Sequence, residues 1–447
     1  MVNESALNAA QERWFPAAAK SDEGSSALSR SRPKILLAAS KWWPLSARLA
    51  GALHRHGCDV SAICPLQHSL MHVTGMGRTY RYGSIASLSS LQRAVRESEA
   101  ELVIPCDDSV VVQLHALHAI DPSLRPLIER SLGSPDSFDV VGNRYRLLSL
   151  AAELGVRVPR TRRVSHADDL VDWHDNVSPI AVVKVDGDSG GNGVRISRSL
   201  SDSQAAFERF RQPASLAAAL KRTAVDCDPL ALWMRRHRTS REVSVQEFIS
   251  GRPANSMCFC WQGQLVAIVS VVVVAAEGPT GAATIVRPIR NERMKNAAEV
   301  LASKLKLSGF FGLDFVLEST TGVPYLIEMN PRCTQLGHID LPGMGSLAGA
   351  LAAVLKGEPP PASKSTMRSD TIALFPQALC AGEACRAYFE AAYHDVPTDD
   401  PPLMRELMQK SWPHRQWKWR LYHHLNPMNR AEPAMFESLE AKAQTVA

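Results

Sequence analysis

The sequence lacks the features of a disulfide-rich or membrane-spanning protein. Its nine cysteines are scattered and include no CxxC pair, which favours a reducing compartment over a disulfide framework. The first residues contain no apolar core of the signal-peptide type. The longest apolar run, residues 266–276, is interrupted by Ser270 and is too short to span a bilayer, so it predicts a buried strand. We therefore expect a cytoplasmic protein without a transmembrane segment.

Two common nucleotide-binding motifs are also absent. The sequence contains no GxGxxG, so a dinucleotide site is not expected. It contains no glycine-rich loop that ends in Gly-Lys-Ser/Thr, which excludes a Walker-type phosphate loop. The net charge of +5 is spread over 447 residues and gives no argument for nucleic-acid binding. A chain of this length is expected to form about two to four domains.

The chain is expected to begin with a flexible tail and a parallel α/β domain. Residues 1–32 are small and polar, and residues 33–140 predict a Rossmann-like domain. A strand, an amphipathic helix and a second strand open this domain, and their order predicts a parallel sheet. The predicted segments are strands 34–39, 59–64 and 101–105 and helices 44–56 and 87–99.

Polar side chains follow two of these strands, at the sheet edge where ligands commonly bind. Lys41 and Trp42 follow the first strand, and Asp107 and Asp108 follow the third. The two aspartates are also well placed to cap the next helix, and we favour capping as their role. Contact with a substrate is the alternative.

A glycine-rich stretch at residues 180–196 predicts a strand, a loop and a second strand. Lys184 lies on the first of these strands. The loop amides can turn toward a phosphate, because glycines place no side chain in the way. A tight hairpin with glycine at its turn explains the same residues equally well. The glycines are Gly187, Gly190, Gly191 and Gly193.

The chain is organised around residues 309–332, which predict two apolar strands joined by a Ser/Thr/Gly turn. Asp314 lies on the first strand and Glu328 on the second. Asn330 and Arg332 follow Glu328 at two-residue steps, so they share its face. Two carboxylates and an amide oxygen suit Mg²⁺, and an arginine beside them suits an anion. A hairpin with ordinary edge charges is the alternative.

Together these stretches resemble the ATP-grasp superfamily, in the branch that includes biotin carboxylase and carbamoyl-phosphate synthase. The resemblance covers roughly residues 34–360, and its most specific piece is the motif EMNPR at residues 328–332. It implies an α/β and α+β fold, in which the Rossmann-like domain precedes a two-subdomain ATP-grasp domain at residues 141–360. Residues 366–447 are then expected to form a mainly helical C-terminal extension.

The resemblance also implies roles for individual residues. Mg²⁺, with Mn²⁺ as an alternative, would be held on the ATP phosphates by Asp314, Glu328 and Asn330. Lys184 would contact the α- and β-phosphates, and two arginines would stabilise charge during the reaction, Arg332 and Arg287. A loop over the phosphates and a strand beside the adenine would supply the other nucleotide contacts, which are Asp188, Ser189, Gly190, Gly191, Gly193, Gln246, Glu247, Phe248 and Ile249.

Two positions depart from the family pattern. The family usually has a second phosphate-contacting lysine where this chain has Arg144, which keeps the positive charge but changes its shape and reach. Many members have an acidic residue after the linker strand, where this chain has Pro253. We therefore expect Arg144 to contact phosphate, whereas the contact to the ribose stays open.

The activity implied by the resemblance is that of an ATP-dependent carboxylate–amine ligase. A carboxylate would attack the γ-phosphate of ATP to give an acyl phosphate, and an amine or another nucleophile would then displace the phosphate. A small-molecule kinase and a non-catalytic nucleotide-binding regulator are the alternatives. The expected partners are a small carboxylate and an amine, without nucleic acid, and the formation of a homo-oligomer stays open.

Three shorter segments complete the prediction. Residues 411–424 are rich in tryptophan and arginine and could touch a membrane surface or nucleic acid, but we expect their tryptophans to pack on their own domain. The basic cluster at residues 235–238 is expected on a solvated helix face. A turn is expected at residues 250–253.

Overall fold

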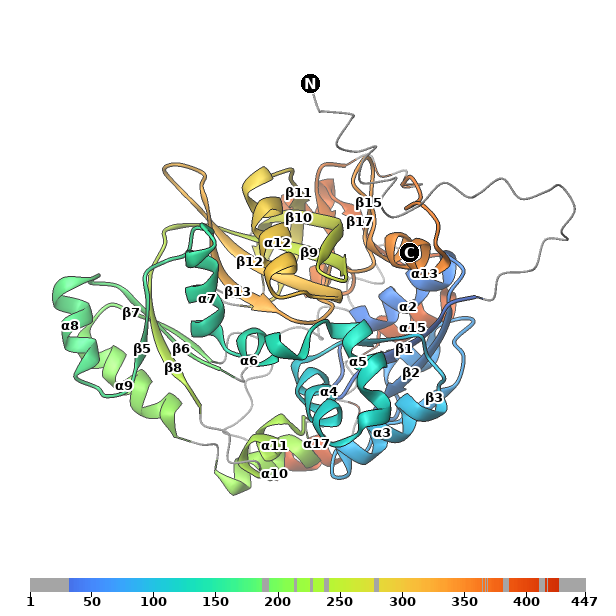
Figure 1. Cartoon of the computed structure of the whole chain (residues 1–447), viewed down its shortest axis with the longest axis horizontal. Helices are drawn as coiled ribbons and strands as arrows, with labels where there is room; N and C mark the ends of the chain where they lie inside the picture. Colours follow the sequence, from blue (N-terminus) through green and yellow to red (C-terminus); the bar gives the residue numbers. More distant parts are fainter. Residues whose placement is uncertain are drawn as a thin grey trace, which may run out of the picture.

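The computed structural model describes residues 32–186, 193–212, 215–225, 228–236, 241–276, 281–363, 365, 367, 369–380, 386–409, 415 and 417–425. These residues form a four-stranded parallel sheet, a second four-stranded sheet, a seven-stranded sheet and a two-stranded ribbon (Figure 1). The predicted α/β and α+β fold class is confirmed. Among the described helices, none is long and apolar enough to cross a membrane.

The N-terminal sheet is parallel and has the strand order β3-β2-β1-β4. Alternate residues of β1 pack on opposite faces, with Leu37 in one hydrophobic core and Leu36 in another. The predicted strands and helices are present, whereas the sequence did not predict β3 and α5. The elements are β1 (Lys34–Ala38), α2 (Leu45–Arg55), β2 (Asp59–Cys64), η1 (Ser69–His72), β3 (Thr79–Arg81), α3 (Ser87–Glu97), β4 (Leu102–Pro105), α4 (Asp108–Ile120), η2 (Pro122–Leu124) and α5 (Arg125–Leu132).

A second four-stranded sheet is antiparallel and has the order β5-β8-β6-β7. Its buried face packs on two helices through Trp173 of α8 and Phe207 of α9, and Figure 1 shows this lobe in green. The elements of this region are η3 (Pro135–Ser137), α6 (Phe138–Val141), α7 (Arg144–Glu153), β5 (Thr161–Val164), α8 (Asp169–Asn176), β6 (Ala181–Val185), β7 (Val194–Ser197), α9 (Leu200–Arg211), α10 (Leu216–Ala224), α11 (Leu230–Arg236) and β8 (Val243–Glu247).

The seven-stranded sheet has the order β13-β12-β9-β10-β11-β16-β17. One face packs through Phe311 against helices α7 and α12, and the other packs through Phe310 and Phe259 against α2 and α13. This alternation follows from the apolar strand sequences, which are buried on both faces. The elements are β9 (Gly251–Trp261), β10 (Gln264–Ala276), β11 (Ala283–Pro288), α12 (Glu292–Lys304), β12 (Gly309–Glu318), β13 (Pro324–Asn330), β14 (Asp340–Leu341), β15 (Gly345–Ser346) and α13 (Leu347–Lys356).

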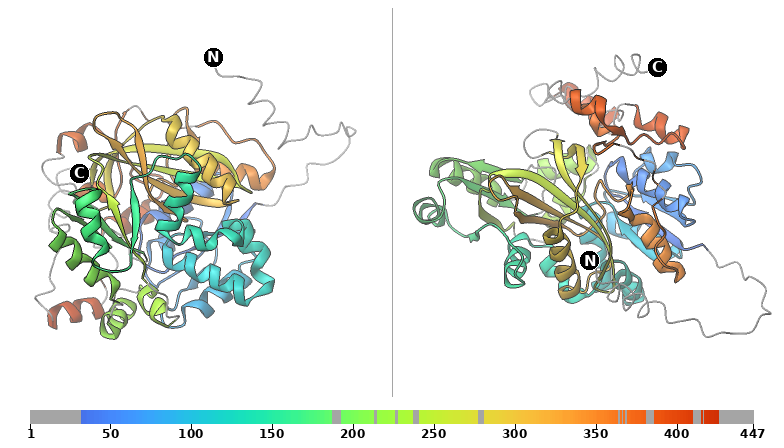
Figure 2. Two further views of the ribbon diagram at one scale, coloured as in Figure 1. Left: turned by 60° about the vertical axis from the view of Figure 1, so that its left-hand side comes forward. Right: turned by 90° about the horizontal axis from the view of Figure 1, so that it is seen from above.

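The C-terminal part of the chain contacts both the N-terminal region and the seven-stranded sheet. Two short strands extend the seven-stranded sheet, and a buried carboxylate, Asp395, is bonded to Arg48 of α2 at 2.5 Å and to His338 at 2.5 Å. Helix α15 packs against η1 of the N-terminal region, and the right-hand view of Figure 2 shows red C-terminal helices above the blue N-terminal elements. The elements are β16 (Ile372–Ala373), η4 (Gln377–Cys380), α14 (Arg386–Ala391), β17 (Tyr393–His394), α15 (Pro401–Leu407) and α17 (Trp417–Leu425).

Residues 250–253 do not form the predicted turn. Strand β9 already begins at Gly251, and Pro253 pairs with Val316 of β12, whereas β10 first pairs with β9 at Ala254. Pro253 thus lies where β9 has a neighbour on one side only, and a proline without an N–H is tolerated there. A Cβ on Gly251 would lie 2.1 Å from the backbone oxygen of Leu317, so a close approach of two strands explains this glycine.

Gly309 gives a test of this packing. It opens β12 with φ +83°, and a Cβ there would lie 2.3 Å from the backbone oxygen of Ser131. We expect Gly309→Ala to lower the free energy of unfolding by about 2 kcal/mol or more, because it adds a clash to a strained backbone. Urea denaturation measures the loss. Gly322, at φ +67° with nothing described within 4 Å of its Cβ, is the matched control. If Gly322→Ala lost an equal free energy of unfolding, the clash with the backbone oxygen of Ser131 would not be the cause of the loss in Gly309→Ala.

Candidate active site

A cavity of about 1510 Å³ lies where the three larger sheets meet. The N-terminal sheet contributes the residues that follow β1 and β4, which are adjacent parallel strands. Strands β6 and β8 of the antiparallel four-stranded sheet, strands β9, β12 and β13 of the seven-stranded sheet and helices α7 and α11 also line it. The cavity therefore brings together stretches that are far apart in the sequence. Among them are Lys41, Trp42, Asp107, Asp108, Arg144, Lys184, Gly193, Gln246, Asn255, Asp314, Glu328, Asn330 and Arg332.

The predicted metal-binding strands pair as the sequence indicates. Strands β12 and β13 are antiparallel, with Asp314 opposite Glu328 and Gly312 opposite Asn330. The pairing shifts by one residue directly after Asp314, and all three polar side chains line the cavity. The expected shared face of Asp314, Glu328 and Asn330 is therefore confirmed, and their role as metal ligands stays a prediction.

Two amides hold the Asp314 carboxylate. Asn255 of β9 donates from Nδ2 to Oδ1 at 2.5 Å, and Asn330 donates from Nδ2 to Oδ2 at 3.0 Å. Burial, and then the Glu328 carboxylate, raise the pKa of Asp314 to about 6. The sequence analysis missed Asn255. Strand register could have found it, because β9 places Asn255 directly opposite Asp314.

Arg144, at the start of α7, lies between two carboxylates. Its Nη2 is 2.7 Å from Oε1 of Glu328, and its Nη1 is 3.5 Å from Oδ1 of Asp186. Nη1 also donates to the backbone oxygen of Val185 at 3.2 Å. The arginine thus faces the cavity at the position where the resemblance implies a lysine. The sequence analysis did not single out Asp186, which follows β6.

Lys184 is buried beside this arginine. Its side chain projects from β6, and Nζ donates to the backbone oxygen of Ile327 at 3.4 Å. Burial, and then the charge of Arg144, lower the pKa of Lys184 to about 7. Burial also raises the pKa of Asp186 to about 6. A charged ligand beside these cations and carboxylates would therefore shift their pKa values.

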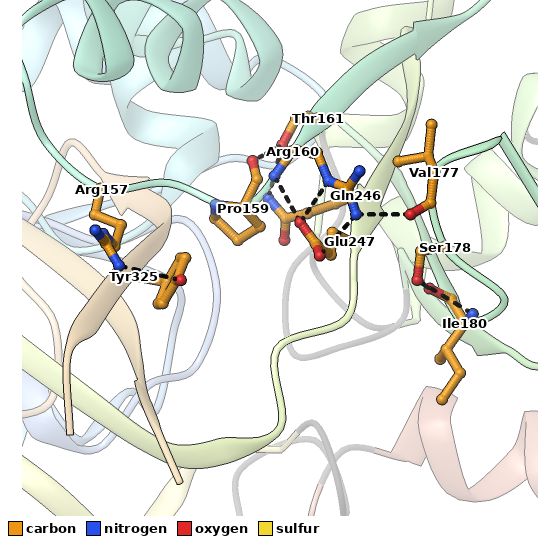
Figure 3. Close-up of polar contacts among 10 residues, drawn as sticks. All are labelled: Arg157, Pro159, Arg160, Thr161, Val177, Ser178, Ile180, Gln246, Glu247 and Tyr325. Carbon is orange, nitrogen blue, oxygen red and sulfur yellow. Dashed lines mark hydrogen bonds and ion pairs between the residues drawn. The ribbon is translucent and has the colours of Figure 1, made fainter. Parts of the chain in front are cut away.

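The predicted adenine-binding strand, β8, lies beside β5 (Figure 3). Nε2 of Gln246 donates to Oγ1 of Thr161 at 3.2 Å. Arg160 binds Glu247 through Nε and Nη2, each at 3.0 Å, so the Glu247 carboxylate is occupied within the protein. The four predicted residues of this segment line the cavity, and these are Gln246, Glu247, Phe248 and Ile249.

Arg332 joins the large sheet to the N-terminal domain. Its Nε is 2.6 Å from Oδ1 of Asp108, and its Nη2 donates to Oδ1 of Asn330 at 3.2 Å. Although burial opposes the charge, Asp108 holds the pKa of Arg332 above its usual value. Asp107 instead accepts from the backbone N–H of Val110 at 3.1 Å, so the predicted capping role is confirmed for Asp107.

One predicted site residue, Arg287, does not line the cavity, and others lie outside the described residues. Arg287 lies on β11, does not line the cavity, and pairs through Nε with Oδ2 of Asp370 at 3.2 Å. The predicted loop contacts Asp188, Ser189, Gly190 and Gly191 lie outside the described residues, as do residues 237–238 of the basic cluster and residues 411–414. Gly193 is described and lines the cavity.

The donor set fits a magnesium ion that keeps phosphate ligands. The described residues contain no group of three or more His, Cys, Asp or Glu side chains that could hold a metal alone. Oδ1 of Asn255 is buried and has no hydrogen-bond partner among the described residues, and it lies beside the Asp314 carboxylate. Carboxylate and amide oxygens, completed by phosphate oxygens, are the ligands that Mg²⁺ prefers.

The fold and the cavity define a protein with a site lined by buried cations and carboxylates, between an antiparallel four-stranded sheet and the seven-stranded sheet. Residues 142–335 match a family model described as the ATP-grasp domain. Residues 142–335 therefore carry an ATP-grasp domain, and the predicted resemblance to the ATP-grasp superfamily is confirmed for this part of the chain. No curated protein sequence matches the chain significantly.

Several solved structures share the fold. An N5-carboxyaminoimidazole synthase from Aspergillus clavatus, in complex with ADP and 5-aminoimidazole ribonucleotide, has 13% identity and a TM-score of 0.54, over 74% of this chain and 79% of that chain. The biotin carboxylase domain of Hydrogenobacter thermophilus 2-oxoglutarate carboxylase, with MgADP, ADP and bicarbonate, has 13% identity and a TM-score of 0.51, over 74% and 71%. The match to Rhizobium etli pyruvate carboxylase, at 18% identity and a TM-score of 0.49, covers 77% of this chain but 29% of that chain.

Proposed function

We propose that this protein is an ATP-dependent ligase that activates a carboxylate as an acyl phosphate for attack by an amine or another nucleophile. The observation that supports it is the convergence in one cavity of the phosphate-binding cations, the predicted metal ligands and an arginine for an anionic substrate. These are Arg144, Lys184, Asp314, Glu328, Asn330 and Arg332. A cavity of about 1510 Å³ is large enough for a nucleotide together with a second small molecule.

The nucleotide would lie between the antiparallel four-stranded sheet β5-β8-β6-β7 and the seven-stranded sheet. Lys184 and Arg144 would meet its phosphates, and backbone groups of residues 246–249 would meet the adenine. Phosphoryl transfer needs positioning and charge neutralisation more than a covalent protein group. Arg144 and Lys184 would supply both, because bound phosphates favour the charged form of each side chain. Two of the structures with a similar fold contain ADP, which supports the proposal of a nucleotide at this site.

Mg²⁺ bound to Asp314 and Glu328 would neutralise the triphosphate and the charge that develops at the transferred phosphoryl group. Arg144 pairs with Glu328, and Oδ1 of Asn330 accepts a hydrogen bond from Nη2 of Arg332. We therefore propose that Arg144 exchanges Glu328 for a phosphate when ATP binds. Asn330 would likewise turn its oxygen from Arg332 toward the metal site.

Arg332 is the group that we propose for the carboxylate substrate and its acyl phosphate. Its guanidinium reaches from the metal-binding strands to Asp108 at the N-terminal end of the cavity. The acid and its nucleophile would therefore enter beside Lys41, Trp42 and Asp108. A closed site would protect the acyl phosphate from water while the nucleophile displaces phosphate.

The organisation of the chain is part of the same proposal. The Rossmann-like domain at residues 33–140 would contribute to the substrate end of the cavity, and the ATP-grasp domain at residues 141–360 would hold ATP and the metal ion. The C-terminal extension would begin at residue 366. We propose a cytoplasmic enzyme that uses small-molecule substrates.

An ADP-release screen with paired acids and amines tests the proposed reaction. We expect ADP release that needs both an acid and a nucleophile, and a product whose mass is their sum less one water. ADP release with an acid or alcohol alone, together with a stable phosphorylated product, would favour the kinase alternative. Tight ATP binding without turnover over the whole panel would favour the regulator.

The low pKa of Lys184 predicts that ATP binding depends on pH. With a pKa of about 7, the ammonium of the free protein is lost as the pH rises above neutrality. Phosphate favours the charged form, so the affinity for MgATP should fall as the pH rises, by up to about tenfold per unit. Calorimetry between about pH 6.5 and about pH 8.5 measures this slope. The same slope in Lys184→Met would assign it to another group or to the nucleotide itself.

A further inference from the structure

The end of the molecule formed by α10, α11 and α17 exposes large apolar side chains. On α10, Leu216 and Leu220 are 51% and 49% exposed, and on α17, Trp417 and Leu421 are 63% and 48% exposed. The members of each pair are four residues apart, so each pair lies on one face of its helix. The expected packing of the C-terminal tryptophans on their own domain is therefore wrong for Trp417.

The three helices lie side by side. Helix α11 packs against α10, and Nζ of Lys221 on α10 lies 5.3 Å from the ring centre of Tyr422 on α17. Figure 1 shows all three at the lower edge of the molecule. The two exposed apolar pairs thus belong to neighbouring helices, although about 200 residues separate them in the sequence.

The charge of these helices has one sign. They contain six Lys or Arg residues and no Asp or Glu residue, and the basic residues with described side chains are Lys221, Arg222, Arg235 and Arg420. Asp228, in the segment between α10 and α11, pairs with Arg222 at 2.6 Å. The combination of leucine and tryptophan with lysine and arginine on short helices is typical of surfaces that lie in a membrane interface.

We propose that this face binds the surface of a membrane that contains anionic phospholipid. The exposed Trp417 and leucines would enter the boundary between headgroups and acyl chains, while the basic side chains would meet the lipid phosphates. A nucleic acid would use the charges but would leave four large apolar side chains in water. The contact would be peripheral, because no described helix can span a bilayer.

The position of the face links it to the cavity. Leu230 and Trp233 of α11 line the cavity, so one helix contributes both to the cavity wall and to the basic face. A membrane bound at α10, α11 and α17 would therefore lie next to the cavity. The inference itself rests on exposure and charge and holds whichever reaction the site performs.

Vesicle sedimentation with the full chain tests the proposal without any measurement of activity. We expect binding to phosphatidylcholine vesicles that contain about 30% phosphatidylglycerol, weaker binding at high salt, and little binding to phosphatidylcholine alone. The double variant Trp417→Ser with Leu421→Ser should bind about tenfold more weakly. Arg420→Glu should bind about fivefold or more weakly, since each basic residue near the surface contributes about this factor.

The matched control is Ile85→Ser, which removes an apolar side chain that is 75% exposed on the segment between β3 and α3. It should bind vesicles like the unaltered protein. If the α17 variant melts early by circular dichroism, Leu216→Ser with Leu220→Ser tests the same face on α10. Equal binding of all variants, or no vesicle binding, would overturn the proposal. Binding of single-stranded RNA instead, or a dimer that only the α10 and α17 variants lose, would also overturn it.

Discussion

Replacing Glu328 with glutamine is expected to abolish ADP release while leaving the fold intact. Glutamine keeps the size of the side chain but removes the charge that faces both Arg144, at 2.7 Å, and the predicted metal site. Loss of a metal-binding carboxylate should lower the rate by at least about a hundredfold, because mutation even of its outer partners typically costs about 10–100-fold. A coupled ADP-release assay measures the effect once a productive acid and nucleophile are known.

Glu318→Gln is the control for this substitution. Glu318 ends the same strand, β12, but accepts a hydrogen bond from Thr321 in the turn and does not line the cavity. It should retain the unaltered rate, and circular dichroism should give native spectra for both variants. Normal turnover by Glu328→Gln would remove Glu328 from the proposed site and would leave the hairpin with ordinary edge charges.

Replacing Lys184 with methionine is expected to lower kcat/KM for ATP by about a hundredfold or more, because one preorganised cation is removed from a buried phosphate site. Methionine fills a similar volume, so the buried position should stay packed. It should even stabilise the fold below neutral pH, since the buried ammonium is unfavourable there. Steady-state kinetics and a thermal melt at pH 6 measure the two effects.

The matched control is Lys34→Met, at a lysine that is exposed and pairs with Glu99 on the surface. It should leave kcat/KM unchanged. A loss of kcat without a change in ATP affinity in Lys184→Met would place Lys184 at the transferred phosphoryl group instead of the α- and β-phosphates. No loss in either parameter would exclude it from the nucleotide site.

Much of the site follows from local sequence. The alternation of side chains along β12 and β13 places Asp314 opposite Glu328, because a strand turns every second residue to the same face. The glycines and Lys184 around residues 180–196 likewise indicate two strands and a loop. Residues 250–253 show the limit of such rules. Glycine and proline predicted a turn there, but both residues lie in β9. At Pro253, β9 pairs with β12 on one side and not yet with β10 on the other, and a proline without an N–H is tolerated at such a position.

Apart from β3, α5 and the start of β9, the sequence by itself determined the strands and helices around the site and the charged residues on them, because these depend on the periodicity of neighbouring residues. Only the tertiary structure decided which charges meet. Arg332 contacts Asp108 across 224 residues, Arg144 contacts Glu328 across 184, and Arg287 is paired with Asp370 outside the cavity. Likewise, only the packing of α17 beside α10 decided that Trp417 faces solvent. Such contacts depend on the order of strands and the packing of layers, which residues close in sequence do not specify.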